Sequence, residues 1–204
     1  AVDKKLERLE KGIRLNDKKI IAQREFALKA KAHLEAGNPA RTLPFNEDEK
    51  LILRDFFLIT AKPVLYVCNV AEGEPSHMDN VHTGAVAAKA AKEGAQAISV
   101  CAKIEAELSE LSDGDREIFL KDLGIEEAGL SRLIKAGYEL LGLATFLTAG
   151  ESETRAWTIK KGFLAPQAAG VIHSDFERGF IKAEVVNYKD LLDNGSLSAA
   201  REKG

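Results

Sequence analysis

The first part of the chain has the hydrophobic pattern of amphipathic helices. Leu6, Leu9 and Ile13 recur at spacings of three and four residues, and this stretch holds neither proline nor alternating polar and apolar positions. Gly12 and residues 16–17, Asn-Asp, interrupt the pattern. We therefore expect either two helices or a helical hairpin.

A further helix is predicted after Asn46. Three acidic residues follow it, which is typical of an N-cap with an acidic first turn and a capping box. This helix would carry the apolar residues at positions 51–53, 56 and 57. We expect it to end near Thr60, because a residue ahead of Pro63 is disfavoured in the helical conformation.

A strand, a helix and a second strand follow in the order of a βαβ unit. Residues 64–70 and 97–102 are short apolar runs, which are typical of strands covered on both faces. An alanine-rich helix over residues 79–93 would join them as parallel neighbours. Ligands on parallel sheets bind beyond the carboxyl ends of the strands. Those ends are residues 69–72 and 101–105, so two polar clusters should meet at one edge.

The remaining sequence predicts helices and then a small α+β module. Helices are expected over about residues 115–122 and 126–141, each followed by a glycine. The pattern then alternates, which predicts strands. The four candidates are residues 144–148, 155–159, 170–173 and 183–186. A short helix is expected between residues 175 and 180, and residues 187–204 are polar and helix-like without a closing strand.

The composition, 45% hydrophobic and 30% charged over 204 residues, is that of a globular protein. No run approaches the roughly 18 apolar residues of a membrane span, and the charged start is unlike a signal peptide. We expect a cytoplasmic protein with no membrane contact. Cys68 and Cys101 lie in apolar runs without C-x-x-C spacing, which predicts buried thiols instead of a zinc site or disulfide framework.

Charge is distributed unevenly along the chain. Residues 1–41 carry 11 basic and 6 acidic side chains, residues 42–146 carry 10 and 18, and residues 147–204 carry 8 of each. Such asymmetry indicates separate modules. The basic first segment could contact a polyanion such as RNA, or it could be an ordinary solvated helical face.

Two short motifs follow the two predicted strands. Residues 69–72, Asn-Val-Ala-Glu, and residues 101–103, Cys-Ala-Lys, resemble the N-K-x-D and S-A-K motifs by which GTPases hold the base. A planar base is held by a side-chain amide and a carboxylate on one edge, by backbone N–H groups on another, and by an aliphatic stem over its face. The alternative is a strand-ending turn, a helix-start acid and an exposed lysine.

A wider resemblance places these motifs in a family. Six segments resemble the corresponding sequences of the YchF proteins, the Obg-like ATPases. They are residues 58–72, 122–127, 136–138, 145–150, 155–159 and 169–180. The resemblance covers about residues 40–204, and residues 1–40 fit the helical insertion of these proteins.

The resemblance implies an α/β fold in three parts. Residues 1–45 would be a helical, coiled-coil insertion, and residues 46–143 the C-terminal half of a P-loop nucleotide-binding domain with its parallel sheet. Residues 144–204 would be a TGS domain, an α+β module of β-grasp-like form that looks truncated.

The resemblance also implies an activity. The intact protein would bind and hydrolyse ATP with Mg²⁺, use GTP less well, and associate with the ribosome through its large subunit. Nothing in the sequence demands more than a monomer. Asn69 would reach the base edge, Val70 would contact the base through its backbone, and Lys103 would lay its stem along a face. Backbone N–H groups of Cys101 and Ala102 would complete the site.

Glu72 departs from the GTPase pattern, which has an aspartate at this position. That aspartate accepts two hydrogen bonds from guanine. Because the Glu72 side chain is one methylene longer, its carboxylate no longer fits guanine in this way, and adenine is no longer rejected.

The phosphate-binding motifs of a P-loop enzyme do not occur in this sequence. It contains no G-x-x-x-x-G-K-[ST] and no D-x-x-G where a switch loop would stand. In the family this half precedes the helical insertion, so we expect the chain to start after it. The catalytic residues are therefore unknown, and we expect this stretch alone to be inactive.

The C-terminal module offers a weaker candidate surface. Arg155, Lys160 and Lys161 could contact RNA or the ribosome, together with Trp157 unless that ring belongs to the core. The cluster of His173 with the acids at 175 and 177 is read as a turn cap, and the remaining histidines, at 33, 77 and 82, lack metal-ligand spacing. The alternative function is therefore a ribosome- or RNA-binding module with no nucleotide chemistry of its own.

Overall fold

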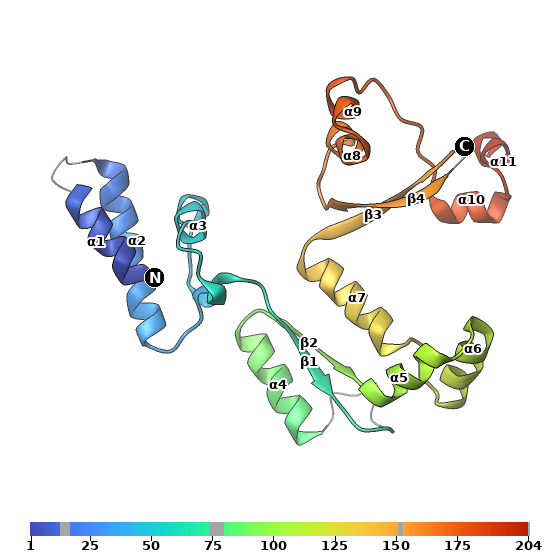
Figure 1. Cartoon of the computed structure of the whole chain (residues 1–204), viewed down its shortest axis with the longest axis horizontal. Coiled ribbons are helices and arrows are strands. Elements are labelled where there is room, and N and C mark those ends of the chain that lie inside the picture. The colour runs from blue at the N-terminus through green and yellow to red at the C-terminus, as the bar shows by residue number, and fades with distance from the viewer. Residues whose placement is uncertain (13–16, 74–79, 151–152, 204) are drawn as a thin grey trace. The chain divides into compact units, whose positions relative to one another are not determined.

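The computed structural model describes residues 1–12, 17–73, 80–150 and 153–203. They divide into two compact units, Ala1–Leu141 and Gly142–Gly204 (Figure 1). The first is an α/β unit with a small parallel sheet, and the second holds an antiparallel hairpin with short helices. Among the described residues, every helix is too short or too polar to cross a membrane.

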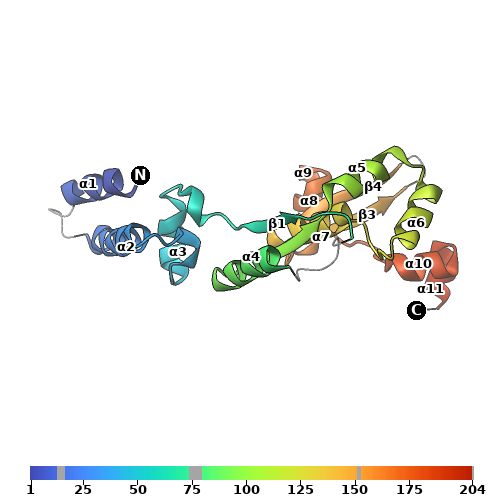
Figure 2. The ribbon, with the colours of Figure 1, turned by 90° about the horizontal axis from the view of Figure 1, so that it is seen from below.

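The first unit begins with two helices, as the interrupted pattern predicts. Helix α1 spans Val2–Gly12 and α2 spans Lys18–Glu35, and they lie side by side in Figures 1 and 2. Asp17 caps α2, because its side chain accepts a hydrogen bond from the Lys19 N–H at 2.8 Å. One core joins the helices; its α1 and α2 members are Val2, Leu6, Leu9, Phe26, Ala27 and Ala30. The rest of the predicted break lies outside the described residues.

Helix α3 is shorter than the sequence predicts. It spans Glu47–Arg54 and starts with the predicted capping box between Asn46 and Glu49. The predicted end near Thr60 is wrong, because the chain turns at Phe57, which has a φ of 49°. This turn lets Leu58 and Ala61 join Phe56 at the core of the helical segment. Two short 3-10 helices, η2 (Ala40–Thr42) and η3 (Ile59–Ala61), flank α3.

The βαβ unit is confirmed. Strand β1 (Leu65–Asn69), helix α4 (Val81–Lys92) and strand β2 (Gln96–Val100) follow one another, and the strands pair in parallel. The prediction that both strands are covered on both faces is wrong for β1, where Val67 is 47% exposed. In the described part of the chain the sheet has two strands, so little surrounds β1 beyond β2 and the helices packed on them.

Three helices complete this unit. Helix α5 (Ala102–Glu110) has no counterpart in the sequence prediction, whereas α6 (Asp113–Asp122) and α7 (Gly129–Leu140) match it within a few residues. A second core forms beneath the sheet ends; its buried members are Val70, Cys101, Ile104, Leu108 and Ile125. Cys101 is buried as predicted, Cys68 is half-buried, and both thiols are free.

The second unit begins with two of the predicted strands, which form a hairpin. Strands β3 (Leu143–Ala149) and β4 (Thr154–Lys160) pair antiparallel, and α8 (Ala165–Ile172), α9 (Ser174–Arg178), α10 (Tyr188–Asn194) and α11 (Leu197–Glu202) follow. Helix α9 lies where a short helix is predicted.

Two of the four strand predictions in this unit are wrong. Residues 170–173 belong to α8 and its C-cap, and residues 183–186 have no regular structure. Pro166 in the first turn and the bond from the Leu164 N–H to Gln167 start α8. The helix packs against α9 so closely that a Cβ on Gly170 would lie 2.8 Å from Glu177 Oε2. These contacts override the strand preference of the β-branched residues 171 and 172.

Candidate nucleotide-base site

The carboxyl ends of the two parallel strands meet, and the two motifs meet with them. Asn69 pairs with Val100 in the register of the sheet, and the Val70 N–H donates to the Val100 carbonyl at 3.0 Å. The Asn69 side chain then crosses to the second loop, where its Oδ1 accepts from the Ala102 N–H at 3.1 Å. An asparagine is suited to this position because its other amide atom is a donor that can face a ligand.

The six predicted residues therefore lie on two joined segments, which we call the two motif loops: residues 69–72, from the end of β1, and residues 101–103, which include the start of α5. Val70 and Cys101 are buried in the second core, so only their backbone atoms can serve a ligand. The side chains of Asn69, Glu72 and Lys103 are exposed. The Ala102 N–H is already bonded to Asn69, so it holds the two loops together in this structure.

The charged residues of the two loops form an ion pair. Lys103 Nζ lies 2.8 Å from Glu72 Oε1, and the two side chains are 66% and 49% exposed. The hydrogen bond to Glu72 is the main cause that raises the pKa of Lys103 above its ordinary value. The loops are thus joined twice, by the Asn69 amide and by this pair.

Glu105 joins α5 to the start of α7, and sequence patterns do not predict this role. Its carboxylate accepts from the Gly129 N–H at 2.6 Å and from the Leu130 N–H at 3.1 Å, and so caps α7. A Cβ at Gly129 would lie 2.9 Å from both Glu105 Oε1 and Val100 Cγ1. One feature of the sequence points to a cap from elsewhere in the chain. The helix starts at a glycine, and the preceding alanine has no side chain that could cap it.

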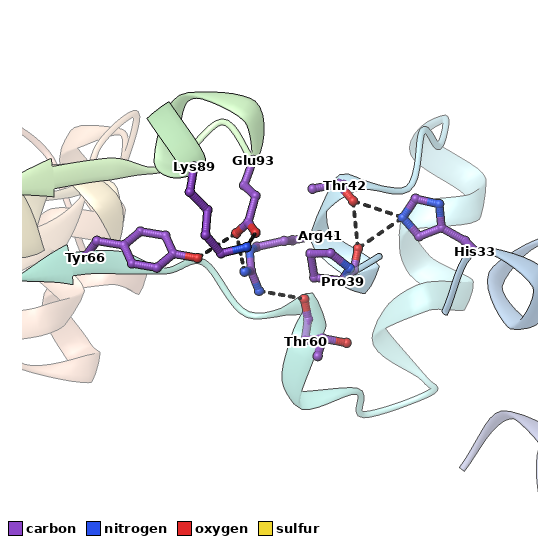
Figure 3. Close-up of polar contacts among 8 residues, drawn as sticks. All are labelled: His33, Pro39, Arg41, Thr42, Thr60, Tyr66, Lys89 and Glu93. Atoms are coloured by element: carbon purple, nitrogen blue, oxygen red, sulfur yellow. Dashed lines mark hydrogen bonds and ion pairs between the residues drawn. The ribbon is translucent and has the colours of Figure 1, made fainter. Parts of the chain in front are cut away.

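A second polar cluster lies at the other end of the sheet (Figure 3). Glu93 accepts hydrogen bonds from Arg41 at 2.5 Å, Lys89 at 2.7 Å and Tyr66 at 2.9 Å. These donors, Lys89 first, lower the pKa of the Glu93 carboxyl to about 2. The cluster joins η2, β1 and α4. Sequence patterns do not predict it, because its members are up to 52 positions apart.

His33 also has a structural role. Its Nε2 lies 2.9 Å from Thr42 Oγ1 and 3.2 Å from the Pro39 carbonyl (Figure 3). Over the residues that the structure describes, no group of three or more histidine, cysteine or acidic side chains could hold a metal ion. His77 lies outside that part of the chain.

A groove of about 500 Å³ lies elsewhere, between α1 and α2. Its charged lining consists of four carboxylates, at positions 3, 7, 10 and 35, and Lys31. Such a lining repels phosphates, so this groove is a poor site for a nucleotide.

The hairpin of the second unit separates its candidate RNA-contacting residues. The Arg155 guanidinium lies over the Trp157 ring, 4.2 Å from its centroid, and Trp157 Nε1 donates to Thr148 Oγ1 at 2.8 Å. Trp157 is half-buried, so its ring is not a core residue but is also not fully exposed for contact with RNA. Lys160 follows Trp157 by three positions and therefore faces the opposite side of the strand, and Lys161 comes after the strand end.

Comparisons with known proteins agree with one another. The chain is 48% identical over 207 residues to the ribosome-binding ATPase YchF of Bacillus subtilis, a match that covers all of this chain and 56% of that protein. It is 40% identical over 202 residues to the protein of the same name from Escherichia coli O157:H7, covering 99% of this chain and 55% of that one. The chain thus spans about half the length of these curated relatives.

Structural and family comparisons extend this result. A solved structure, that of the Schizosaccharomyces pombe YchF GTPase, matches with a TM-score of 0.84 and 32% identity, covering all of this chain and 56% of that one. The family model YchF-GTPase_C, described as a protein of unknown function (DUF933), matches residues 143–204.

Proposed function

Because this chain belongs to the YchF family, we propose that it carries the base-binding part of an ATP-hydrolysing, ribosome-associated P-loop NTPase. The observation that carries this proposal is the hydrogen bond from the Ala102 N–H to Asn69 Oδ1, which joins the two motif loops at the strand ends. The relatives are named ribosome-binding ATPases, and the yeast structure is named a GTPase.

Each residue then has a distinct role toward the base. Asn69 turns its amide nitrogen to the base edge, and Val70 contacts the base through its backbone. Glu72 accepts from the adenine amino group, and the stem of Lys103 lies along the ring face. Cys101 contributes its backbone, and Ala102 acts through its bond to Asn69, which positions the amide.

ATP chemistry requires more than these residues. The sequence holds no phosphate-binding loop, so we assign the phosphate contacts and the Mg²⁺ ligands to the part of YchF proteins that this chain does not match. Residues 1–45 are then the helical insertion, 46–143 the base-binding half of the nucleotide domain, and 144–204 a TGS domain. ATP is preferred to GTP, and the 204-residue chain alone does not hydrolyse either.

The second candidate is a ribosome- or RNA-binding module without nucleotide chemistry. Two observations favour it, the net basic charge of residues 1–41 and the stacking of Arg155 on Trp157 in the hairpin. Lys160, on the opposite face of that strand, and Lys161, after its end, would add contacts from other directions. We propose the large ribosomal subunit as the surface that a monomer of this protein meets.

A titration with a fluorescent adenine nucleotide tests the first candidate. We compare the 204-residue chain with a chimaera in which it replaces the matching part of the Bacillus subtilis protein, and compete with ATP and GTP. The chimaera should bind, with ATP the better competitor. Asn69→Ala should weaken binding at least tenfold, whereas Asn187→Ala, which removes a helix cap in the second unit, should not. Equal binding by both variants would refute the site.

Salt dependence tests the second candidate. Binding of the chain to ribosomal particles should weaken steeply as ionic strength rises, because each neutralised phosphate releases counterions. Binding that ignores salt would contradict an RNA contact through basic side chains.

A further inference from the structure

Glu72 and Lys103 are more closely associated than two neighbouring surface charges need to be. Lys103 Nζ lies 2.8 Å from Glu72 Oε1 but 4.0 Å from Glu107 Oε1 on its own helix. The ammonium group therefore bonds across to the other loop in preference to the i+4 partner along α5.

The fold of the two loops explains this choice. Lys103 is the second residue of α5, where the helix dipole disfavours a cation and favours an anion. The carboxylate of Glu72 neutralises the Lys103 cation and also places an anion near the N-terminus of α5, where the dipole favours it. Its loop is held in place by the bond between Asn69 and Ala102, the residue that precedes Lys103.

The pair limits what the Glu72 carboxylate can accept. Reading guanine requires two parallel N–H bonds, one to each carboxylate oxygen. Here Oε1 is bonded to the ammonium group, so a guanine would have to share or displace it. Adenine presents a single amino group, for which one oxygen suffices.

We propose that Lys103 is a specificity-determining residue, because by holding one carboxylate oxygen of Glu72 it leaves the site suited to the single amino donor of adenine. The inference rests on the proposed base site. It assigns selectivity to a residue of the second loop, in addition to the greater length of the Glu72 side chain.

Two substitutions at Lys103 separate its charge from its stem. Lys103→Met keeps an aliphatic chain over the base but removes the ammonium group, whereas Lys103→Arg keeps a cation. In the chimaera with the Bacillus subtilis protein, we measure dissociation constants for ATP and GTP by competition with a fluorescent adenine nucleotide. Lys103→Met should lower the preference for ATP about three- to fivefold, which is the upper part of the range for an exposed ion pair. Lys103→Arg should retain the preference.

A double-mutant cycle identifies Glu72 as the intermediary. In a Glu72→Gln background, Lys103→Met should leave the ATP-to-GTP ratio unchanged, because the ion pair is already gone. If Lys103→Met leaves the ratio unchanged while Glu72 is present and nucleotide still binds, the inference is overturned and the base site stands. If the unaltered chimaera binds no nucleotide, the base site and the inference both fall.

Discussion

Two adjacent phenylalanines show how differently neighbouring residues are used. Phe56 is 5% exposed and packs against Phe26, with ring centroids 6.1 Å apart, whereas Phe57 is 90% exposed with a φ of 49°. Phe56→Ala should destabilise the first unit by about 3–5 kcal/mol, because it leaves a cavity in the helical core.

Phe57→Ala is the matched control. It removes an exposed ring and should change stability by less than about 0.5 kcal/mol. Phe57→Gly should be neutral or stabilising, since glycine adopts a positive φ without strain. Urea unfolding followed by circular dichroism measures all three, and equal losses for positions 56 and 57 would contradict the packing described.

At the scale of one element, α7 contains two glycines with opposite surroundings. A Cβ on Gly129 would lie 2.9 Å from Glu105 Oε1 and from Val100 Cγ1, whereas nothing lies within 4 Å of a Cβ on Gly137. Gly129→Ala should therefore destabilise the unit by about 1–3 kcal/mol and displace the Glu105 cap. Gly137→Ala should stabilise it by about 0.5–1 kcal/mol through helix propensity. Thermal unfolding of the two variants should shift in opposite directions, and a shared direction would disprove this reading.

The elements also show which sequence patterns predict structure. The cap at Asn46 and the turn at Gly124 were predictable, because each depends on residues within a few positions. The end of α3 was not, since its turn at Phe57 serves a core assembled from distant helices. Residues 170–173 include two β-branched residues, as a strand would, but the close approach of Gly170 to Glu177 favours a helix.

In the candidate site, too, residues brought together by local patterns were predictable and those joined by distant contacts were not. Asn69, Glu72 and Lys103 were predictable, because motif spacing and parallel strand ends bring them to one edge. Two other carboxylates were not predictable, Glu105 beneath the site and Glu93 at the other end of the sheet, because each bonds to groups more than 20 positions away.

At the scale of the whole first unit, Glu93 joins the helical segment to the sheet. Its carboxyl pKa is lowered to about 2 from an ordinary 4.5, so its ionised form stabilises the fold above pH 4.5. That contribution is lost as pH falls from about 4.5 towards 2. Glu93→Gln should therefore unfold at a lower temperature than the unaltered chain at pH 7, and the difference should shrink across this acid range.

Glu47→Gln provides the comparison for this measurement. Glu47 is 89% exposed and contacts only Lys50 among the ion pairs described, so its substitution should leave the melting temperature nearly unchanged at every pH. A Glu93→Gln difference that stays constant between pH 7 and pH 3 would show that the carboxylate charge is not responsible.

The side-chain bonds at the two ends of β1 have a consequence for strand alignment. Tyr66 bonds to Glu93 near the start of the strand, and Asn69 bonds to Ala102 at its end. These residues are three positions apart and so face opposite sides of the sheet. Sliding β1 by one residue along β2 would turn both side chains away from their partners at once. The register of β1 on β2 is thus fixed from both faces, by one tyrosine and one asparagine.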